Sequence, residues 1–364
     1  MEMNEQIITK ASTRFSGIDS VDEIEQIPNG HINLTYRIRS DGRDYILQRI
    51  NTDIFKNPDG LMNNIFSVTE FLRSKVIESG GDPERETLTL VKTKKGEIAH
   101  NDESGLYRMY LFITDSTCYN KAERAGMFGE SAKAFGRFQN LLTEFDATTL
   151  SETIKDFHNT PVRFSNFLKA LENDKAGRKA LCEKEIEFYL SKKDYCSLIT
   201  DRLADGRIPT RVTHNDTKLN NVMIDNESGK GICVIDLDTV MPGSMLYDFG
   251  DSIRFGASSA AEDEKDLDKV YCVPELYDEY TAGFLSEMKD TVTEEELKHL
   301  HDGAIMMTLE CGMRFLTDYL DGDTYFRTHY EGQNLDRART QMKLVMDMEA
   351  RRPIFEAIIS KYTK

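Results

Sequence analysis

The sequence predicts an α+β protein of two lobes, with a small antiparallel sheet first and a larger, mainly helical part after it. Short β-branched and aromatic runs separated by turn residues fill the chain up to Ile113. From Gly129 onward, apolar residues recur at helical spacing instead. Since 364 residues suffice for two ordinary domains, we place the boundary after Ile113, which gives lobes over 1–113 and 114–364.

The first lobe is expected to form a sheet with one helix inserted after its third strand. Ile65, Val68 and Leu72 have the spacing of one helical face, and Asp41-Gly42 is typical of a tight hairpin turn. The expected elements are a helix over 5–15, strands over 24–27, 33–38 and 45–50, a helix over 61–76, and strands over 88–91 and 107–113.

The second lobe is expected to be helical on both sides of one strand–turn–strand unit. Phe135 and Phe138 belong to one apolar face, and Phe164, Phe167 and Leu168 to another. Pro353 should stop or kink the last helix. The later helices are expected over 274–288, 294–319 and 335–351.

Composition excludes several classes of protein. The net charge of −17 makes nucleic acid and anionic membrane surfaces poor partners. Six cysteines without a C-x-x-C pair are typical of reduced thiols in a cytosolic protein. The acidic N-terminus does not have the pattern of a signal peptide, and no apolar run has the length of a membrane span. We therefore expect a cytoplasmic protein without nucleic-acid or membrane partners.

The most informative segment is a predicted hairpin between Asn221 and Asp236. Residues 221–225 and 232–235 have the pattern of strands, and 226–231 are dense in turn formers. Folding about that turn brings Asp236 back beside Asn221. An amide oxygen and a carboxylate form the hard, oxygen-rich corner that Mg²⁺ prefers, and Asp216, just upstream, is placed to accept a proton.

The spacing His214-Asn-Asp216, then Asn221, then Ile235-Asp236 resembles the catalytic loop and metal-binding Asp of the protein-kinase-like superfamily, in its aminoglycoside phosphotransferase/choline kinase branch. The resemblance implies a two-lobed protein-kinase-like fold, with Asp216 as base and with Asn221 and Asp236 holding Mg²⁺ against ATP. The alternative is that these residues only form turns and end strands.

Candidate nucleotide contacts come from both lobes. The backbone of a hinge over 110–113, including Tyr110 and Phe112, is expected to bond adenine, although this segment is equally typical of an edge strand. Lys218 is either a cation for the γ-phosphate or a solvated lysine. Gln48 occupies the position where kinase-like folds usually carry a phosphate-binding lysine, so contacts in the first lobe depart from the pattern.

A closer resemblance is to the bacterial N-acetylhexosamine 1-kinases, which use ATP and Mg²⁺ to phosphorylate the anomeric hydroxyl of N-acetylglucosamine or N-acetylgalactosamine. It implies a neutral amino sugar as substrate, with Asp216 as base and with Arg314 and Tyr325 gripping the ring. His31 and Asn33 are further candidates, unless their loop is a plain hairpin turn. The stretches that carry this resemblance are 30–36, 214–221, 235–256 and 310–320.

Alternatives stay open at the substrate site. Glu310 and Asp318 lie four residues before and after Arg314, a spacing equally typical of structural ion pairs. Tyr247 and Tyr325 either stack on a pyranose ring or pack in the core. The net charge also suits an aminoglycoside (antibiotic) phosphotransferase, and Gln48 is compatible with a non-catalytic, kinase-like nucleotide-binding protein.

Overall fold

The computed structural model describes residues 4–28 and 32–363, and it confirms the predicted fold class, an antiparallel sheet followed by a mainly helical region. The chain forms two compact units. The first unit runs past the predicted boundary at Ile113 and takes in two later segments. It comprises Met1–Thr117, Glu144–Lys155 and Met223–Met241, and the second unit comprises Cys118–Thr143, Asp156–Val222 and Pro242–Lys364.

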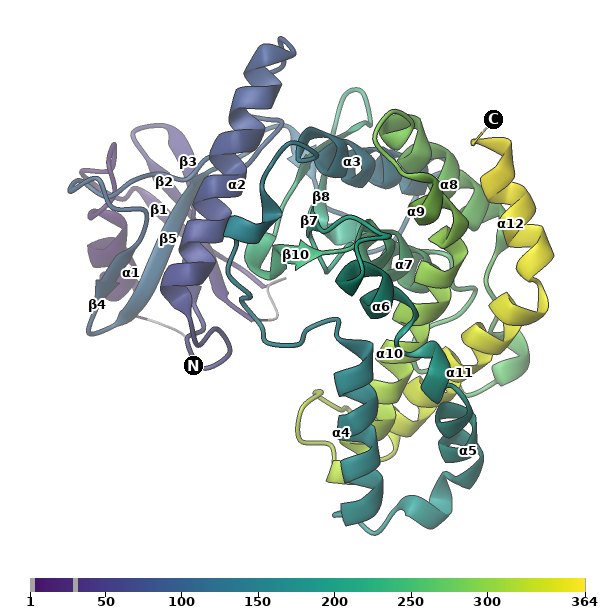
Figure 1. Ribbon diagram of the computed structural model, residues 1–364. Coiled ribbons are helices and arrows are strands. Elements are labelled where there is room, and N and C mark those ends of the chain that lie inside the picture. Colours follow the sequence, from purple (N-terminus) through teal and green to yellow (C-terminus); the bar gives the residue numbers. More distant parts are fainter. Residues whose placement is uncertain (1–3, 29–31, 364) are drawn as a thin grey trace. The chain divides into compact units, whose positions relative to one another are not determined.

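A five-stranded antiparallel sheet forms the framework of the first unit (Figure 1). Asp41 and Gly42 have φ of 48° and 74° and close the β2–β3 hairpin, because a two-residue turn of this kind needs positive φ at both positions. In spatial order the strands are β1 (Glu23–Ile27), β2 (Leu34–Ser40), β3 (Arg43–Ile50), β5 (Gly105–Leu111) and β4 (His100–Asp102).

Two helices accompany this sheet, α1 (Glu5–Ser12) and α2 (Pro58–Glu78), the second starting behind the side-chain cap of Asn57. The predicted strand over 88–91 is wrong. That segment leaves β5 after the single bridge Leu90–Tyr110, too short a pairing to make a strand. The core of the unit contains Ile8, Phe15, Ile38, Leu47, Tyr107 and Met109.

The predicted central hairpin is present. β8 (Val222–Asp225) lies between β6 (Ser116–Thr117) and β9 (Gly231–Val234) in a three-stranded sheet. Within the turn, the Asp225 N–H donates to Lys230 O, and Ser228 donates its N–H and hydroxyl to the Asp225 carboxylate. Asp236 therefore follows the returning strand, as the sequence predicts.

The second unit is built around α10 (Leu300–Asp321), which packs against three other helices (Figure 1). The contact with α7 is close because both helices have glycine there: a Cβ on Gly250 would lie 2.3 Å from Gly303 O. The partners of α10 are α7 (Met245–Gly256), α4 (Thr160–Asn173) and α11 (Gln333–Ala350), while α3 (Met127–Leu141) and α12 (Arg352–Lys361) pack on α8 (Pro274–Met288).

Two helix predictions need adjustment. The helix expected over 294–319 is divided at His299 into α9 (Glu294–Lys298) and α10. The helix expected over 335–351 does end before Pro353, as predicted, and Pro353 lies in the first turn of a new helix, α12. Leu168 is exposed on α4, contrary to expectation, because Phe164, Phe167 and Ala170 form its buried face. The remaining elements are α5 (Glu183–Ser191), α6 (Leu198–Ala204) and the paired strands β7 (Arg211–Thr213) and β10 (Met241–Gly243).

Across residues 4–28 and 32–363, no helix combines the length and the apolar character needed to cross a lipid bilayer.

Candidate active site

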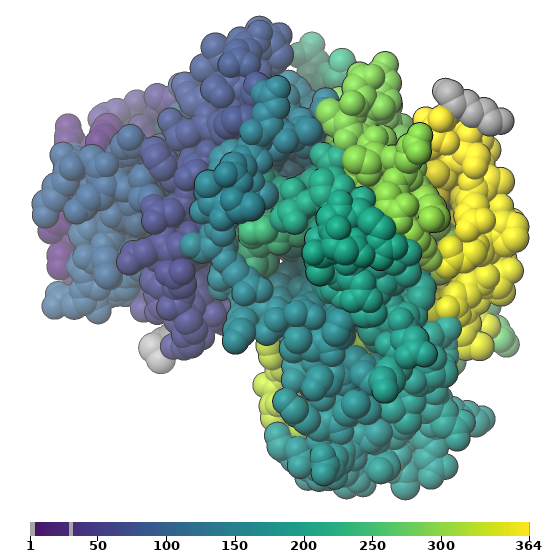
Figure 2. Space-filling view, viewed as in Figure 1, coloured from purple at the N-terminus to yellow at the C-terminus, as the bar shows by residue number. Residues whose placement is uncertain are grey.

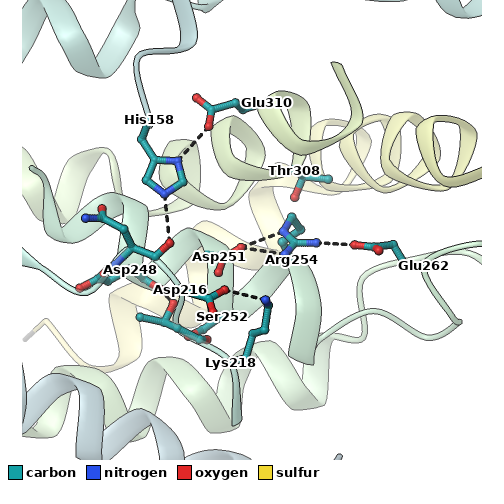
Figure 3. Close-up of polar contacts among 12 residues, drawn as sticks. His158, Asp216, Lys218, Asp248, Asp251, Ser252, Arg254, Glu262, Thr308 and Glu310 are labelled. Atoms are coloured by element: carbon teal, nitrogen blue, oxygen red, sulfur yellow. Dashed lines mark hydrogen bonds and ion pairs between the residues drawn. The ribbon is translucent and has the colours of Figure 1, made fainter. Parts of the chain in front are cut away.

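Asp216 lies in the loop between β7 and β8, where two neighbours orient its carboxylate. Figure 3 shows one of them, Lys218. Lys218 Nζ is 2.6 Å from Asp216 Oδ1. The amide of Asn221 donates to the backbone oxygen of Asp216 at 2.8 Å and to its Oδ2 at 3.1 Å. Because 29% of the Asp216 side chain is exposed, the carboxylate is both oriented and open to a ligand.

The Lys218 ammonium sits between two carboxylates. Burial acts to lower the pKa of Lys218, but Asp216 and Asp251 outweigh it and raise this pKa above the usual value. Lys218 therefore stays protonated at neutral pH beside Asp216.

The backbone of this loop is fixed by the buried carboxylate of Asp248, on α7. Asp248 accepts the N–H of His214 at 2.9 Å and that of Asn215 at 2.7 Å, and the Gln139 amide donates to it at 2.5 Å. Burial raises the pKa of Asp248. Asn215 has a φ of 65°, a left-handed conformation that its neighbours must maintain. Asp248 therefore ties α7 to the loop that carries Asp216.

The buried side chain of His214 supports the loop that carries Asp216. Its ring is buried against the edges of Phe135 and Phe138. Its Nδ1 accepts the Asp216 N–H at 3.2 Å. His214 and Asn215, the first two residues of the H-x-D motif, are therefore buried and bonded within the protein, whereas Asp216 is partly exposed.

His158 is a site residue that sequence reasoning missed. Its Nε2 is 3.2 Å from Asn215 O, and its Nδ1 is 2.8 Å from a carboxylate oxygen of Glu310 (Figure 3). Thr160 donates to the other Glu310 oxygen at 2.6 Å. Burial acts to raise the pKa of Glu310, but His158 and Thr160 outweigh it and lower this pKa. No local motif marks His158, whose partners are 57 and 152 residues away.

Arg314 lies one helical turn beyond Glu310 on α10, among aromatic rings. Its guanidinium carbon is 5.7 Å from the Phe157 centroid, 5.8 Å from that of Tyr325 and 5.4 Å from that of Phe326. Among the described residues it forms no ion pair, so the alternative of i,i+4 pairs with Glu310 and Asp318 does not hold.

The flanking carboxylates have other partners. Glu310 binds His158 and Thr160, while Asp318 accepts the N–H groups of three consecutive loop residues at 2.8–2.9 Å. That loop presents Tyr325, which is 70% exposed, whereas Tyr247 is buried beside His158. Only Tyr325 of these two tyrosines is therefore available to a ligand.

In the first unit, a buried arginine occupies the centre of the sheet. Arg108 on β5 lies directly opposite Gln48 on β3, and its Nε donates to Gln48 Oε1 at 2.9 Å. Its Nη1 bonds the buried carboxylate of Asp238, which also accepts the Asn33 amide at 2.5 Å. Burial acts to lower the pKa of Arg108, but Asp238, Tyr110 and Asp236 outweigh it and raise this pKa. The positive charge that Gln48 does not provide on β3 is carried by Arg108, directly opposite on β5.

Sequence reasoning missed Arg108, although a signal existed. It is the one charged residue in the otherwise apolar and aromatic run over 106–113. The register that sets it beside Gln48 was not predictable from that run, because it depends on how β3 and β5 pair.

Asp236, the predicted metal ligand, has a left-handed backbone, with φ 60° and ψ 57°. Such a conformation at a non-glycine residue is often found at functional sites. Among residues 4–28 and 32–363, no three His, Cys, Asp or Glu side chains gather as a metal site. The predicted ligands, an Asn221 amide oxygen and an Asp236 carboxylate, are nevertheless hard donors that suit Mg²⁺.

The other predicted contacts stay predictions. Tyr110 is buried, with its ring 5.4 Å from the Arg108 guanidinium. The Phe112 N–H donates to Asp44 O, so this backbone donor of the predicted hinge is already engaged within the protein. The side-chain amide of Asn33 donates its N–H to Asp238, and its oxygen accepts the Asn51 N–H. His31 lies outside the described residues.

Comparison with known proteins agrees with this geometry. Residues 23–282 match the model of the phosphotransferase enzyme family. A choline kinase from Cryptosporidium parvum matches with a TM-score of 0.60 at 12% identity, covering 98% of each chain. A spectinomycin phosphotransferase, solved with ADP and spectinomycin, matches with a TM-score of 0.58 at 14% identity, covering 100% of this chain and 99% of that one. The predicted kinase-like fold is confirmed.

Replacing Arg108 with Met should destabilise the protein by about 3–5 kcal/mol, because it leaves the buried Asp238 carboxylate without its cation. Chemical denaturation at pH 7 measures this. The matched exchange of the exposed Lys289 for Met should change stability by less than about 0.5 kcal/mol. Equal losses in the two variants would show that the Arg108–Asp238 pair does not stabilise the fold.

Replacing Glu310 with Gln should reduce stability at pH 7, with the deficit shrinking as pH falls below 4.5. The lowered pKa of Glu310 stabilises the folded state above the unfolded value of 4.5, and this contribution is lost as pH falls through the folded pKa. Urea denaturation from pH 7 down to about pH 3, which spans the range below the unfolded pKa, measures the difference. A deficit independent of pH would contradict an ionised Glu310 in the folded protein.

Proposed function

The chain belongs to the phosphotransferase enzyme family, and from that premise we propose that it transfers the γ-phosphoryl group of ATP to the anomeric hydroxyl of an N-acetylhexosamine, giving the sugar 1-phosphate and ADP. The observation that carries the proposal is the oriented, accessible carboxylate of Asp216 between Lys218 and Asn221. Phosphoryl transfer needs an aligned acceptor oxygen and neutralised phosphate charge more than covalent help.

In this proposal Asp216 accepts the proton of the sugar hydroxyl and orients its oxygen for in-line attack. Lys218, already protonated at 2.6 Å from Asp216, turns toward the transferring phosphoryl group and offsets its charge. The Asn221 amide nitrogen donates to Asp216, so its oxygen would be the atom of this side chain that holds Mg²⁺.

Asn221 and Asp236 are the proposed Mg²⁺ ligands, both offering oxygen donors. When bound, the ion neutralises the triphosphate and holds its terminal oxygens. Gln48, Tyr110 and Phe112 belong to the proposed nucleotide site. Arg108, bonded to Gln48, is a cation next to Gln48, but its charge is paired with the buried Asp238. The charge of the bound phosphates is therefore offset mainly by Mg²⁺ and Lys218 in this proposal.

The proposed acceptor site comprises Arg314 and Tyr325, with Asp216 as the reacting base. Tyr325 is exposed, and Asp318 fixes its loop by accepting backbone N–H groups, so its ring can stack on the apolar face of a pyranose ring. Arg314, without an ion-pair partner among the described residues, offers donors to ring hydroxyls. His158 and Glu310 connect this helix to the catalytic loop, so acceptor and base are held by one rigid set of contacts.

The rival substrate, a polycationic aminoglycoside, is disfavoured by charge. Arg163 and Arg314 line the cavity beside Tyr325 together with two lysines, against two carboxylates that already have partners. A polycation would need the opposite balance. The neutral amino sugar is therefore the acceptor we favour.

An ADP-release assay across acceptors tests the substrate. N-acetylglucosamine and N-acetylgalactosamine should support turnover with Mg²⁺ and ATP, while glucose, choline and kanamycin should give at most a tenth of that rate. Phosphorus NMR of the product should show an anomeric phosphate. Turnover confined to kanamycin would overturn the sugar assignment and leave the phosphotransferase chemistry in place.

Replacing Asp216 with Asn should lower kcat by about 10²–10⁴-fold, because the general base is lost, while the Kd for Mg–ATP stays within about threefold. The exchange of the exposed Asp290 for Asn is the matched control and should leave kcat unchanged. Single-turnover kinetics and nucleotide titration measure the two quantities. Unchanged turnover in the Asp216 variant would remove Asp216 from the mechanism.

A further inference from the structure

A groove of about 480 Å³ lies between α4 and α10 in the second unit. Figures 1 and 2 show the yellow-green segment that follows α10 emerging beside α4, and this segment forms the rim with Tyr325 and Phe326. On α4 the lining residues are Arg163, Asn166, Lys169, Ala170 and Asn173, which recur at the spacing of one helical face.

The groove is larger than one neutral sugar requires. The lining face of α4 extends over eleven residues, from Arg163 to Asn173, which is about 15 Å at a rise of 1.5 Å per residue. A single pyranose ring covers only part of that length. Space therefore remains beyond the ring that Tyr325 and Arg314 hold.

The charge of the groove is opposite to that of the chain. Four cationic side chains and two carboxylates line it, leaving a net charge of +2 in a protein of net charge −17. Both carboxylates are already bonded, Asp318 to backbone N–H groups of the rim and Asp321 to Lys175 at 3.1 Å. The positive charge is therefore concentrated on the remaining cations.

Two guanidinium groups in this lining have no carboxylate within ion-pair distance. Arg163 donates its Nε and an Nη to Phe157 O, at 3.2 and 2.8 Å, and in the described part of the chain it forms no ion pair. The Arg314 guanidinium lies 5.4–5.8 Å from three aromatic rings, and it too forms no ion pair among the described residues. Burial and the Arg314 charge lower the pKa of Arg163 against the opposing effect of Glu310, so the two cations are close enough to interact.

The groove holds more cations than carboxylates, and an anionic ligand can balance this excess. A neutral sugar needs mixed donors and acceptors, and it gains little from an excess of cations. Arginine forks match the geometry of phosphate and carboxylate groups. The groove thus has the chemistry of an oxyanion site adjoining a sugar site.

We propose that Arg163, Arg314 and Lys169 bind an oxyanion, a phosphate monoester or carboxylate, carried by the acceptor sugar on the side remote from its reacting hydroxyl. The inference rests on the proposed function and deepens it, since it extends the acceptor class from neutral to acidic amino sugars. Phe157 and His158 are adjacent in sequence, and they contact Arg163 and the backbone of Asn215 respectively. The oxyanion site is thereby joined to the catalytic loop.

Isothermal titration of N-acetylglucosamine 6-phosphate against N-acetylglucosamine tests this directly. With the nucleotide site filled by Mg²⁺ and a non-hydrolysable ATP analogue, the phosphate should bind at least tenfold more tightly at 50 mM salt. The advantage should shrink at 500 mM salt, because exposed charges are screened. No turnover is needed, so the result does not depend on whether either sugar is phosphorylated.

Replacing Arg163 and Lys169 with Gln should reduce the advantage to less than about threefold, and replacing the exposed Lys169 alone should reduce it in part without risk to folding. The exchange of Lys289 for Gln, a lysine outside the groove, should preserve it. Equal affinity for both sugars, or an advantage that survives in the double variant, would overturn the proposal. Inorganic phosphate binding as tightly as the sugar phosphate would also overturn it, since the anion would then not belong to the acceptor.

Failure of the proposed function gives a different result. If no N-acetylhexosamine is phosphorylated in the ADP-release assay but the phosphate advantage and its loss in the variants are observed, the oxyanion site stands and the reaction assigned to it does not. If the neutral sugars are phosphorylated but the sugar phosphate does not bind more tightly than the neutral sugar, the proposed reaction stands and the oxyanion site does not.

Discussion

The buried carboxylate of Asp248 is the constraint on which the candidate catalytic loop depends. It accepts two successive backbone N–H groups, of His214 and Asn215, and so maintains the left-handed conformation of Asn215 that a side chain otherwise disfavours. The His158 ring contacts the backbone carbonyl oxygen of Asn215. Because the loop is bonded through its backbone, the Asp216 side chain remains directed to the surface while everything around it is fixed.

Much of the fold was predictable from local pattern. The limits expected for α8 are those observed, and the Asp41-Gly42 turn and the central hairpin follow from residues with strong positional preferences. The motif residues Asp216 and Asn221 are bonded to each other, as their spacing indicates. These features share one cause, since each depends on interactions between residues close in sequence.

What escaped prediction depends on partners that are distant in sequence. Arg108 meets Asp238 across 130 positions, and His158 meets Glu310 across 152. Spacing around Arg314 left two ion pairs open as an alternative, but the neighbouring carboxylates bind groups brought to them by tertiary folding. The segment over 88–91 has the composition of a strand, yet its pairing partner leaves it after one bridge. Intrinsic preference cannot decide between such outcomes, because packing does.

The interleaved composition of the first unit bears on how the protein is made. Its sheet is complete by Leu111, but the carboxylate that neutralises Arg108 belongs to a segment synthesised 130 residues later. A nascent chain emerging from the ribosome therefore carries an uncompensated guanidinium in the middle of an apolar strand until translation passes Asp238. The first unit therefore cannot complete its contacts until Asp238 has been synthesised, so its folding depends on a segment far beyond its sheet.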